Sequence, residues 1–179
     1  PCDPESQGRP GLDSYRCECA AGYANGMCGA GWDQTPEFTQ LYGPTCAVST
    51  GGHCDIDMNE CISSPCENGA GCTESSAGGW DGRVVAADAF SCACVPGWTN
   101  GLCAYNFTNE YASACNVREG GACDEDLDEC LSNPCTNGGA CSDSTVNSSV
   151  PINAFSCACA AGFSHGFCAY SFSEALPIQ

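Results

Sequence analysis

The chain has 179 residues, a formal net charge of −18 and 20 cysteines. Its four basic residues are all arginine, so it lacks the basic face that nucleic acid or an anionic membrane requires in a partner. The acidic excess favours a cation as partner, and the plain alternative is an acidic surface that only keeps the chain soluble.

Cysteine makes up about 11% of the residues, which is above the level typical of a disulfide scaffold. Thiolate metal sites would need C-x2-C pairs with partner histidines at regular spacing, and the sequence has none. We therefore expect disulfides and an extracellular protein, secreted or at the cell surface. Large aliphatic residues are sparse, so several small modules are expected in place of one large core.

Membrane and targeting signals are missing from the sequence. No apolar run approaches the ~20 residues that span a bilayer, and we expect no membrane insertion within this chain. No signal peptide is visible, which suggests a processed product or a piece of a longer protein.

The chain is organised around a stretch that occurs twice, at Cys54–Cys72 and Cys123–Cys141, with every cysteine matched. Such an internal repeat indicates an array of similar units. We divide the chain into a partial module (1–28), a first connector (29–54), a first complete module (55–103), a second connector (104–123), a second complete module (124–168) and the start of a further connector (169–179).

The two connectors share the pattern F-T-x2-Y-x3-C-x7-C, which begins at Phe38 and at Phe107. Phenylalanine and tyrosine four residues apart share one face of a short helical turn. Paired glycines before the last cysteine, at 51–52 and 120–121, predict a tight turn inside a small disulfide loop.

Each C-x8-C segment carries a turn signal before its second cysteine, namely Asn25, Asn100 or His165, each followed by glycine. Asparagine and histidine tolerate the left-handed conformation that such a turn needs. His165 is thus interpreted as a turn residue. No catalytic constellation is present, because the cysteines are expected in bridges and little remains for acid–base chemistry. We expect that the protein is not an enzyme.

The six-cysteine spacing, the x-x-G-aromatic step after the fifth cysteine and the D-x-[DN]-E-C lead-in resemble the calcium-binding EGF-like repeat, from which Notch and fibrillin arrays are built. The resemblance covers both complete modules well and the partial module in part. It implies tandem modules of short β-hairpins, with cysteine-bearing connectors, in an elongated rod. The connectors lie outside the family pattern.

The family pairs its cysteines first to third, second to fourth and fifth to sixth. Carried over, this implies Cys61–Cys72, Cys66–Cys92, Cys94–Cys103, Cys130–Cys141, Cys135–Cys157, Cys159–Cys168, Cys2–Cys17 and Cys19–Cys28. The remaining cysteines would pair locally, as Cys46–Cys54 and Cys115–Cys123, and we favour this arrangement. The alternative is that Cys94 reaches Cys123 around a nested Cys103–Cys115 bond.

The resemblance also implies two calcium sites, because calcium takes oxygen ligands from carboxylates and carbonyls. In each lead-in the family's ligands are an aspartate, the next backbone carbonyl and a glutamate, with a further side chain two residues after the third cysteine. The candidate ligands are Asp57, Met58, Glu60 and Glu74 in the first complete module, and Asp126, Leu127, Glu129 and Asp143 in the second. Glu74 departs from the family's Asp or Asn, so the second site matches better.

Sugar attachment is expected in an extracellular chain. Asn106 and Asn147 begin N-glycosylation sequons. The family's O-glucose pattern C-x-S-x-P-C is matched at Ser63 and Ser132, and its O-fucose pattern is not matched.

We therefore expect an extracellular structural repeat protein, a stiff, calcium-braced, glycosylated rod that assembles with itself into a filament. The EGF-bearing proteins of algal flagellar hairs (mastigonemes) have an architecture of this sort. The alternative is a protein-recognition module of an adhesion receptor or ligand, since the fold serves both functions.

Overall fold

The structure is a computed structural model that describes residues 14–28, 36–48, 50–75, 84–103 and 115–171. The chain divides into two compact units, one made of residues 1–66 and 72–92 and the other of residues 67–71 and 93–179. In the described part of the chain, no helix has the length and apolar character needed to cross a membrane.

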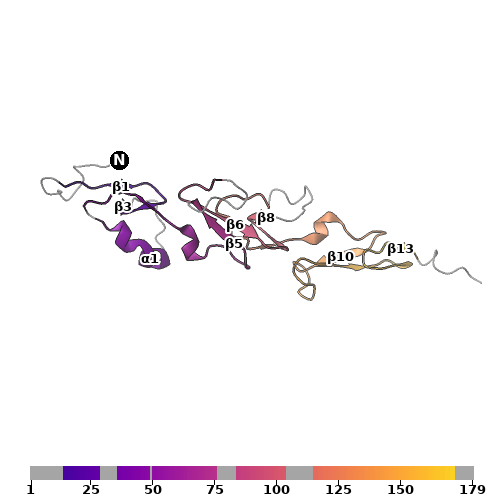
Figure 1. The fold of residues 1–179 in the computed structure, drawn as a ribbon. Coiled ribbons are helices and arrows are strands. Elements are labelled where there is room, and N and C mark those ends of the chain that lie inside the picture. Colours follow the sequence, from indigo (N-terminus) through magenta and orange to yellow (C-terminus); the bar gives the residue numbers. More distant parts are fainter. Residues whose placement is uncertain (1–13, 29–35, 49, 76–83, 104–114, 172–179) are drawn as a thin grey trace, which may run out of the picture. The chain divides into compact units, whose positions relative to one another are not determined.

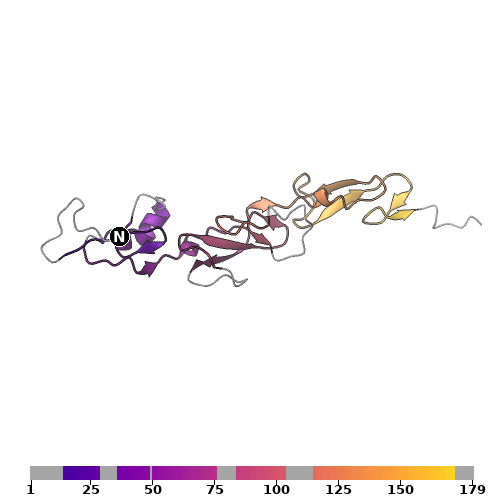
Figure 2. The same ribbon diagram turned by 90° about the horizontal axis from the view of Figure 1, so that it is seen from above.

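The first unit combines the partial module, the first connector and part of the first complete module. In chain order its elements are β1(Glu18–Cys19), β2(Tyr23–Ala24), β3(Met27–Cys28), α1(Pro36–Cys46), β4(Ile56–Asp57), the 3-10 helix η1(Glu60–Ser63), β5(Gly71–Glu74) and the start of β6(Phe90–Cys94). Strand β1 pairs in parallel with β3, and β2 pairs antiparallel with β4. Helix α1 lies beside the β1–β3 pair in both views (Figures 1 and 2). The helical turn predicted for this connector is therefore confirmed.

The second unit repeats the same plan. Its remaining elements are β7(Trp98–Thr99), β8(Leu102–Cys103), β9(Glu125–Asp126), the 3-10 helix η4(Glu129–Ser132), β10(Ala140–Asp143), β11(Phe155–Ala158), β12(Phe163–Ser164) and β13(Tyr170–Ser171). Strands β10 and β11 form an antiparallel hairpin, as do β12 and β13, and β7 pairs antiparallel with β9. The end of β6 pairs in parallel with β8, with Ala93 opposite Leu102 and Cys94 opposite Cys103.

The strands are short because the chain supplies few apolar side chains to bury, and the interior is built largely from half-cystines. Buried cysteines include Cys17, Cys19, Cys92, Cys94, Cys115, Cys123 and Cys168, joined by Ala24, Met58, Val85 and Leu127. This is the small disulfide-rich fold, consistent with tandem EGF-like modules, that the sequence predicts. Large cores of aliphatic residues are not found among the described residues.

The turn residues adopt the conformations expected of them. Asn25, Asn100 and His165 have φ of 70°, 65° and 71°, in the left-handed region. The connector glycines Gly51 and Gly120 also have positive φ. Asparagine, histidine and glycine tolerate this region better than most residues, which explains their place in the repeat.

Nine disulfides join described residues, and among these residues no cysteine is free. Five agree with the expected pairs: Cys61–Cys72, Cys66–Cys92, Cys130–Cys141, Cys135–Cys157 and Cys159–Cys168. The expected Cys2–Cys17 bond involves Cys2, which lies outside the described residues.

The favoured local pairing of the connectors is wrong. The expected bonds Cys19–Cys28, Cys46–Cys54, Cys94–Cys103 and Cys115–Cys123 are replaced by Cys19–Cys54, Cys28–Cys46, Cys94–Cys123 and Cys103–Cys115. At the second connector this is the nested arrangement stated as the alternative, and the first connector has the same arrangement.

The nested bonds form because each connector folds back onto the preceding hairpin. The N–H of Cys123 donates to the Asn100 carbonyl at 2.7 Å, which brings Cys123 to the hairpin turn and beside Cys94. A β-bridge between Leu102 and Asn116 sets Cys103 next to Cys115. The same contacts recur in the first connector.

Cys168 aligns in sequence with Cys103 but takes the structural place of Cys123. Both Cys123 and Cys168 are fully buried and have left-handed φ of 56° and 60°. The carbonyl of each accepts a hydrogen bond from an asparagine side chain, Asn68 or Asn137, at 3.0 and 2.9 Å. Cys123 follows a connector and Cys168 does not. Both nevertheless have the same backbone conformation and the same asparagine hydrogen bond.

Candidate functional site

Each lead-in segment is attached to the hairpin that precedes it. Asp57 of β4 lies opposite Tyr23 of β2, and the N–H of Met58 donates to the Gly22 carbonyl at 2.8 Å. In the second unit, Asp126 of β9 lies opposite Trp98 of β7. There the N–H of Leu127 donates to the Gly97 carbonyl at 2.9 Å. The two lead-ins therefore hold their acidic residues at equivalent places, next to an aromatic residue of the preceding hairpin.

A short 3-10 helix follows each lead-in and presents its glutamate. Asn59 caps η1 by accepting a hydrogen bond from the N–H of Cys61 at 3.0 Å, and Asp128 caps η4 through the N–H of Leu131 at 3.2 Å. Asparagine and aspartate are favoured N-cap residues because their side-chain oxygen satisfies an otherwise free N–H group. The cap places Glu60 and Glu129 in the first turn, near the lead-in aspartate.

The first acidic group contains Asp57, Glu60 and Glu74. Asp57 accepts a hydrogen bond from Ser75 through Oδ2 at 2.9 Å, whereas its Oδ1 is buried without a hydrogen-bond partner. Oε2 of Glu60 is also buried without a partner, and Glu74 is a buried residue at the end of β5. Burial raises the pKa of Glu60 to about 7, and the charges of Asp57 and Glu74 add to this effect.

The second acidic group repeats this arrangement with Asp126, Glu129 and Asp143. Asp126 accepts from Ser144 through Oδ2 at 2.7 Å, and its Oδ1 is buried without a hydrogen-bond partner. Both carboxylate oxygens of Glu129 are buried without partners. Burial raises the pKa of Glu129 to about 7, and the charges of Asp126 and Asp143 contribute.

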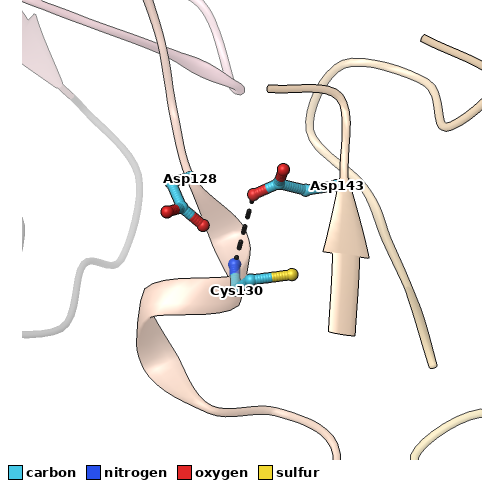
Figure 3. A group of neighbouring side chains, drawn as sticks. All are labelled: Asp128, Cys130 and Asp143. Carbon is cyan, nitrogen blue, oxygen red and sulfur yellow. Dashed lines mark hydrogen bonds between the residues drawn. The ribbon is translucent and has the colours of Figure 1, made fainter. Parts of the chain in front are cut away.

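The second group contains a further carboxylate, that of Asp128, which the sequence reasoning did not include. Asp128 and Asp143 lie on either side of the start of η4, and the N–H of Cys130 donates to Asp143 at 3.4 Å (Figure 3). Oxygens of the two carboxylates and the Cys130 sulfur lie within 4.8 Å of one another. That sulfur is bonded to Cys141, so only the carboxylates remain as ligands for a hard cation.

The two neighbouring carboxyl groups have opposite pKa shifts. A hydrogen bond with Asp143, then burial, raises the pKa of Asp128. Burial acts to raise the pKa of Asp143, but hydrogen bonds from Thr145, Asp128 and backbone N–H groups lower it overall. Asp143, at 1% exposure, is thus the more readily ionised of the two carboxyl groups.

The structure brings the candidate side chains of each site into one group. The charges of Asp57 and Glu74 act on Glu60, and those of Asp126 and Asp143 act on Glu129. Met58 and Leu127, expected to contribute backbone carbonyls, have buried side chains that fix the lead-in backbone. Among the described residues, each group offers carboxylate oxygens, and together with the expected carbonyls these make up the donor set of a hard cation.

Two residues near the sites were missed. Asp128 could have been found from the sequence, because it occupies the third place of the lead-in. Tyr42 donates from its hydroxyl to the Asn59 carbonyl at 2.6 Å. The connector pattern places a tyrosine at this position in both connectors. The sequence, however, gives no sign that the first connector contacts the acidic group.

The expected sugar acceptors are partly described. Ser63 and Ser132 are exposed, and each hydroxyl donates to a backbone carbonyl one turn earlier, of Glu60 or Glu129, at 2.9 Å. Asn147 is exposed and accepts from the N–H of Ser149 at 3.1 Å. Asn106 lies outside the described residues.

Comparison with known proteins gives relatives that carry EGF-like repeats. No protein-family model matches the chain. Delta-like protein 4 of Rattus norvegicus is 33% identical over 90 residues, which is 50% of this chain and 9% of that protein. The EGF-like repeat and discoidin I-like domain-containing protein 3 of Mus musculus is 28% identical over 135 residues, 75% of this chain and 20% of that protein. Neurogenic locus notch homolog protein 1 of Xenopus tropicalis is 32% identical over 92 residues, 50% of this chain and 2% of that protein.

The chain therefore spans only a small part of the length of these relatives. Its disulfides fit EGF-like modules, and such a scaffold persists in an oxidising compartment. The fold is small and disulfide-rich, consistent with tandem EGF-like modules, and the protein is extracellular, secreted or at the cell surface.

Proposed function

We propose that each acidic group binds one calcium ion. The first ion would be held by Asp57, Glu60, Glu74 and the carbonyl of Met58, and the second by Asp126, Glu129, Asp143 and the carbonyl of Leu127. The observation that carries this proposal is the set of buried carboxylate oxygens without partners, on Asp57, Glu60, Asp126 and Glu129. Buried charged oxygens are costly unless they are paired or coordinate a metal.

Calcium suits this donor set better than softer metals. Carboxylates and carbonyls are hard oxygen ligands, and no histidine or free thiol lies in either group. When bound, calcium would supply positive charge to carboxylates that otherwise repel one another. The Asp128 carboxylate, beside Asp143, adds negative charge to the second site.

The position of the two sites supports a structural role for the ion. Each site lies where a lead-in strand pairs with the preceding hairpin, so a bound ion would hold the end of one module against the start of the next. We propose an extracellular structural repeat protein in which calcium stiffens these junctions. The chain would form a rod that assembles with itself, as in a filament, and carry glycans at Ser63, Ser132, Asn106 and Asn147.

Calcium binding is tested by titration calorimetry on the intact, oxidised chain. We expect two binding events for the native sequence and one for Glu60→Gln or Glu129→Gln, because each substitution removes a ligand charge and little volume. Glu119→Gln is the matched control, since Glu119 is exposed and lies in neither group. Native protein that binds no calcium, or binds it unchanged in both site variants, would contradict the proposal.

Assembly is tested by electron microscopy of native material with calcium and after chelation. Regular fibres that loosen on chelation are expected for the structural role. Isolated particles under both conditions would exclude the filament.

The second candidate is a protein-recognition module, which is favoured by one repeated surface feature. Ile62 and Leu131 occupy the same position of η1 and η4 and are 50% and 55% exposed. Isolated particles that bind a protein partner, with binding lost in Ile62→Ser and Leu131→Ser, would support this function. Under either candidate we propose no catalytic activity.

A further inference from the structure

Helix α1 belongs to the first connector, which lies outside the EGF-like pattern, and yet it reaches the first acidic group. The Tyr42 hydroxyl donates to the carbonyl of Asn59 at 2.6 Å. Asn59 stands between Met58 and Glu60, two of the candidate ligands. The Asn59 carbonyl belongs to the peptide group that ends at the Glu60 nitrogen, so this hydrogen bond fixes the orientation of the peptide that leads into Glu60.

The helix itself is firmly attached to the preceding hairpin. The Cys28–Cys46 disulfide joins the end of α1 to β3. The Thr45 carbonyl accepts hydrogen bonds from the N–H groups of Asn25 and Gly26, at 3.0 and 3.3 Å. The Thr45 hydroxyl donates back to the Tyr42 carbonyl at 2.8 Å. Tyr42 is therefore presented by a short helix whose C-terminal end is tied at several points.

The lead-in is thus attached to the same hairpin by two separate routes. One route is the pairing of β4 with β2, which carries Asp57. The other runs from the hairpin through α1 and Tyr42 to Asn59. Together the two routes hold both sides of the Met58 peptide, from which the backbone ligand would come.

The electrostatic environment agrees with this placement. Burial raises the pKa of Tyr42, and the negative charges of Glu60 and Glu74 raise it further. The phenol remains protonated and keeps its hydrogen to donate. Its ring therefore lies in the field of two of the carboxylates that would bind the ion.

We propose that Tyr42 is a positioning residue of the first cation site and that the inserted connector helix is part of that site. This inference rests on the proposed calcium binding. It assigns to the connector a function beyond linking modules, because the first site depends on a segment that an EGF-like repeat does not contain.

The test compares calcium titrations of the intact, oxidised native chain with Tyr42→Phe, which removes the hydroxyl and keeps the ring. One neutral hydrogen bond corresponds to roughly a 2- to 12-fold change in affinity. We expect a weakening of this size at the first site and none at the second, which serves as the internal reference. Glu60→Gln and Glu129→Gln assign each binding event to its site. Leu41→Ala is the control on the same helix, because Leu41 is 51% exposed.

Two further measurements separate positioning from general support of the fold. In metal-free protein, amide hydrogen exchange at residues 57–61 should be faster in Tyr42→Phe and unchanged at residues 126–130. Calcium should also produce a near-ultraviolet difference signal from tyrosine in the native chain. This signal should be smaller in Tyr42→Phe, where only Tyr23, opposite Asp57, remains beside the first site.

Unchanged calcium affinity at the first site of Tyr42→Phe would overturn the inference and leave calcium binding intact. Equal weakening at both sites would also overturn it, because that result indicates damage to the whole fold. If the native chain binds no calcium at the first site, both this inference and the proposed calcium site are wrong. The titration of the native chain is sufficient to detect that outcome.

Discussion

A single glycine tests how tightly a lead-in is held against the preceding hairpin. Gly22 lies in the x-x-G-aromatic step, just before Tyr23, and has φ of +84°. It has no side chain where the hairpin meets the lead-in. A Cβ added at Gly22 would clash with the carbonyl oxygen of Ala87 and lie 2.8 Å from the nitrogen of Asp88. These are backbone atoms, so they cannot rotate away as a flexible side chain would. Gly22→Ala must therefore move the segment that contains Ala87.

Gly162 provides the matched control because it occupies the same step of the second complete module. Its φ is +93°, and an added Cβ would meet nothing within 4 Å. Both substitutions place a residue with a Cβ in the left-handed region, which should lower the stability of the fold by about 1–2 kcal/mol. Only Gly22→Ala adds the cost of overpacking, about 1–3 kcal/mol. The difference between the two variants isolates the packing at the junction.

The assay is amide hydrogen exchange of the oxidised protein in saturating calcium, read at the N–H of Met58, which donates to the Gly22 carbonyl. An additional 1–3 kcal/mol corresponds to roughly 5- to 150-fold faster exchange at Met58 in Gly22→Ala. Gly162→Ala should leave Met58 unchanged. Exchange at Met58 that is equally slow in both variants would refute the reasoning, since the junction would then tolerate a side chain.

The remaining predictions concern protons, charge and disulfides. The pKa values of Glu60 and Glu129 are raised to about 7 from an ordinary 4.5, so between these values the folded, metal-free state binds more protons than the unfolded state. The melting temperature without calcium should thus fall as pH rises from 5 to 8, and saturating calcium should reverse this trend. A metal-free melting temperature that rises over this range would contradict the raised pKa values of the two glutamates. Asp128→Asn should weaken calcium binding at the second site about tenfold in low salt and less in high salt, as measured by calorimetry, and an effect equal at both sites would argue against local charge. Proteolytic mapping of the unreduced protein should yield a peptide pair joined through Cys94 and Cys123, and recovery of a local bond at Cys123 would contradict the nested arrangement.

Much of the local structure follows from the sequence alone. The turns at Asn25 and Asn100 are predictable because few residues accept the left-handed region. Asp57 and Glu60 are also predictable, because they belong to the lead-in that resembles the EGF-like repeat. They are close in the chain, since β4 ends at Asp57 and η1 begins at Glu60. Such features depend mainly on neighbouring residues, so a local motif is sufficient to find them.

Tertiary structure decided the features that depend on how the connectors fold back. The spacing of Cys115 and Cys123 allows either a local bond or the nested bonds with Cys103 and Cys94. The wrong choice was favoured because the family's pairing of fifth to sixth cysteine left Cys115 and Cys123 to pair with each other. What decides it is the hydrogen bond from the Cys123 N–H to the Asn100 carbonyl, a contact between two segments. The hydrogen bond from Tyr42 to Asn59 is likewise a contact between two segments, so the sequence does not reveal it. Residue spacing determines local turns and ligand pairs, whereas contacts between distant segments depend on the path of the whole chain.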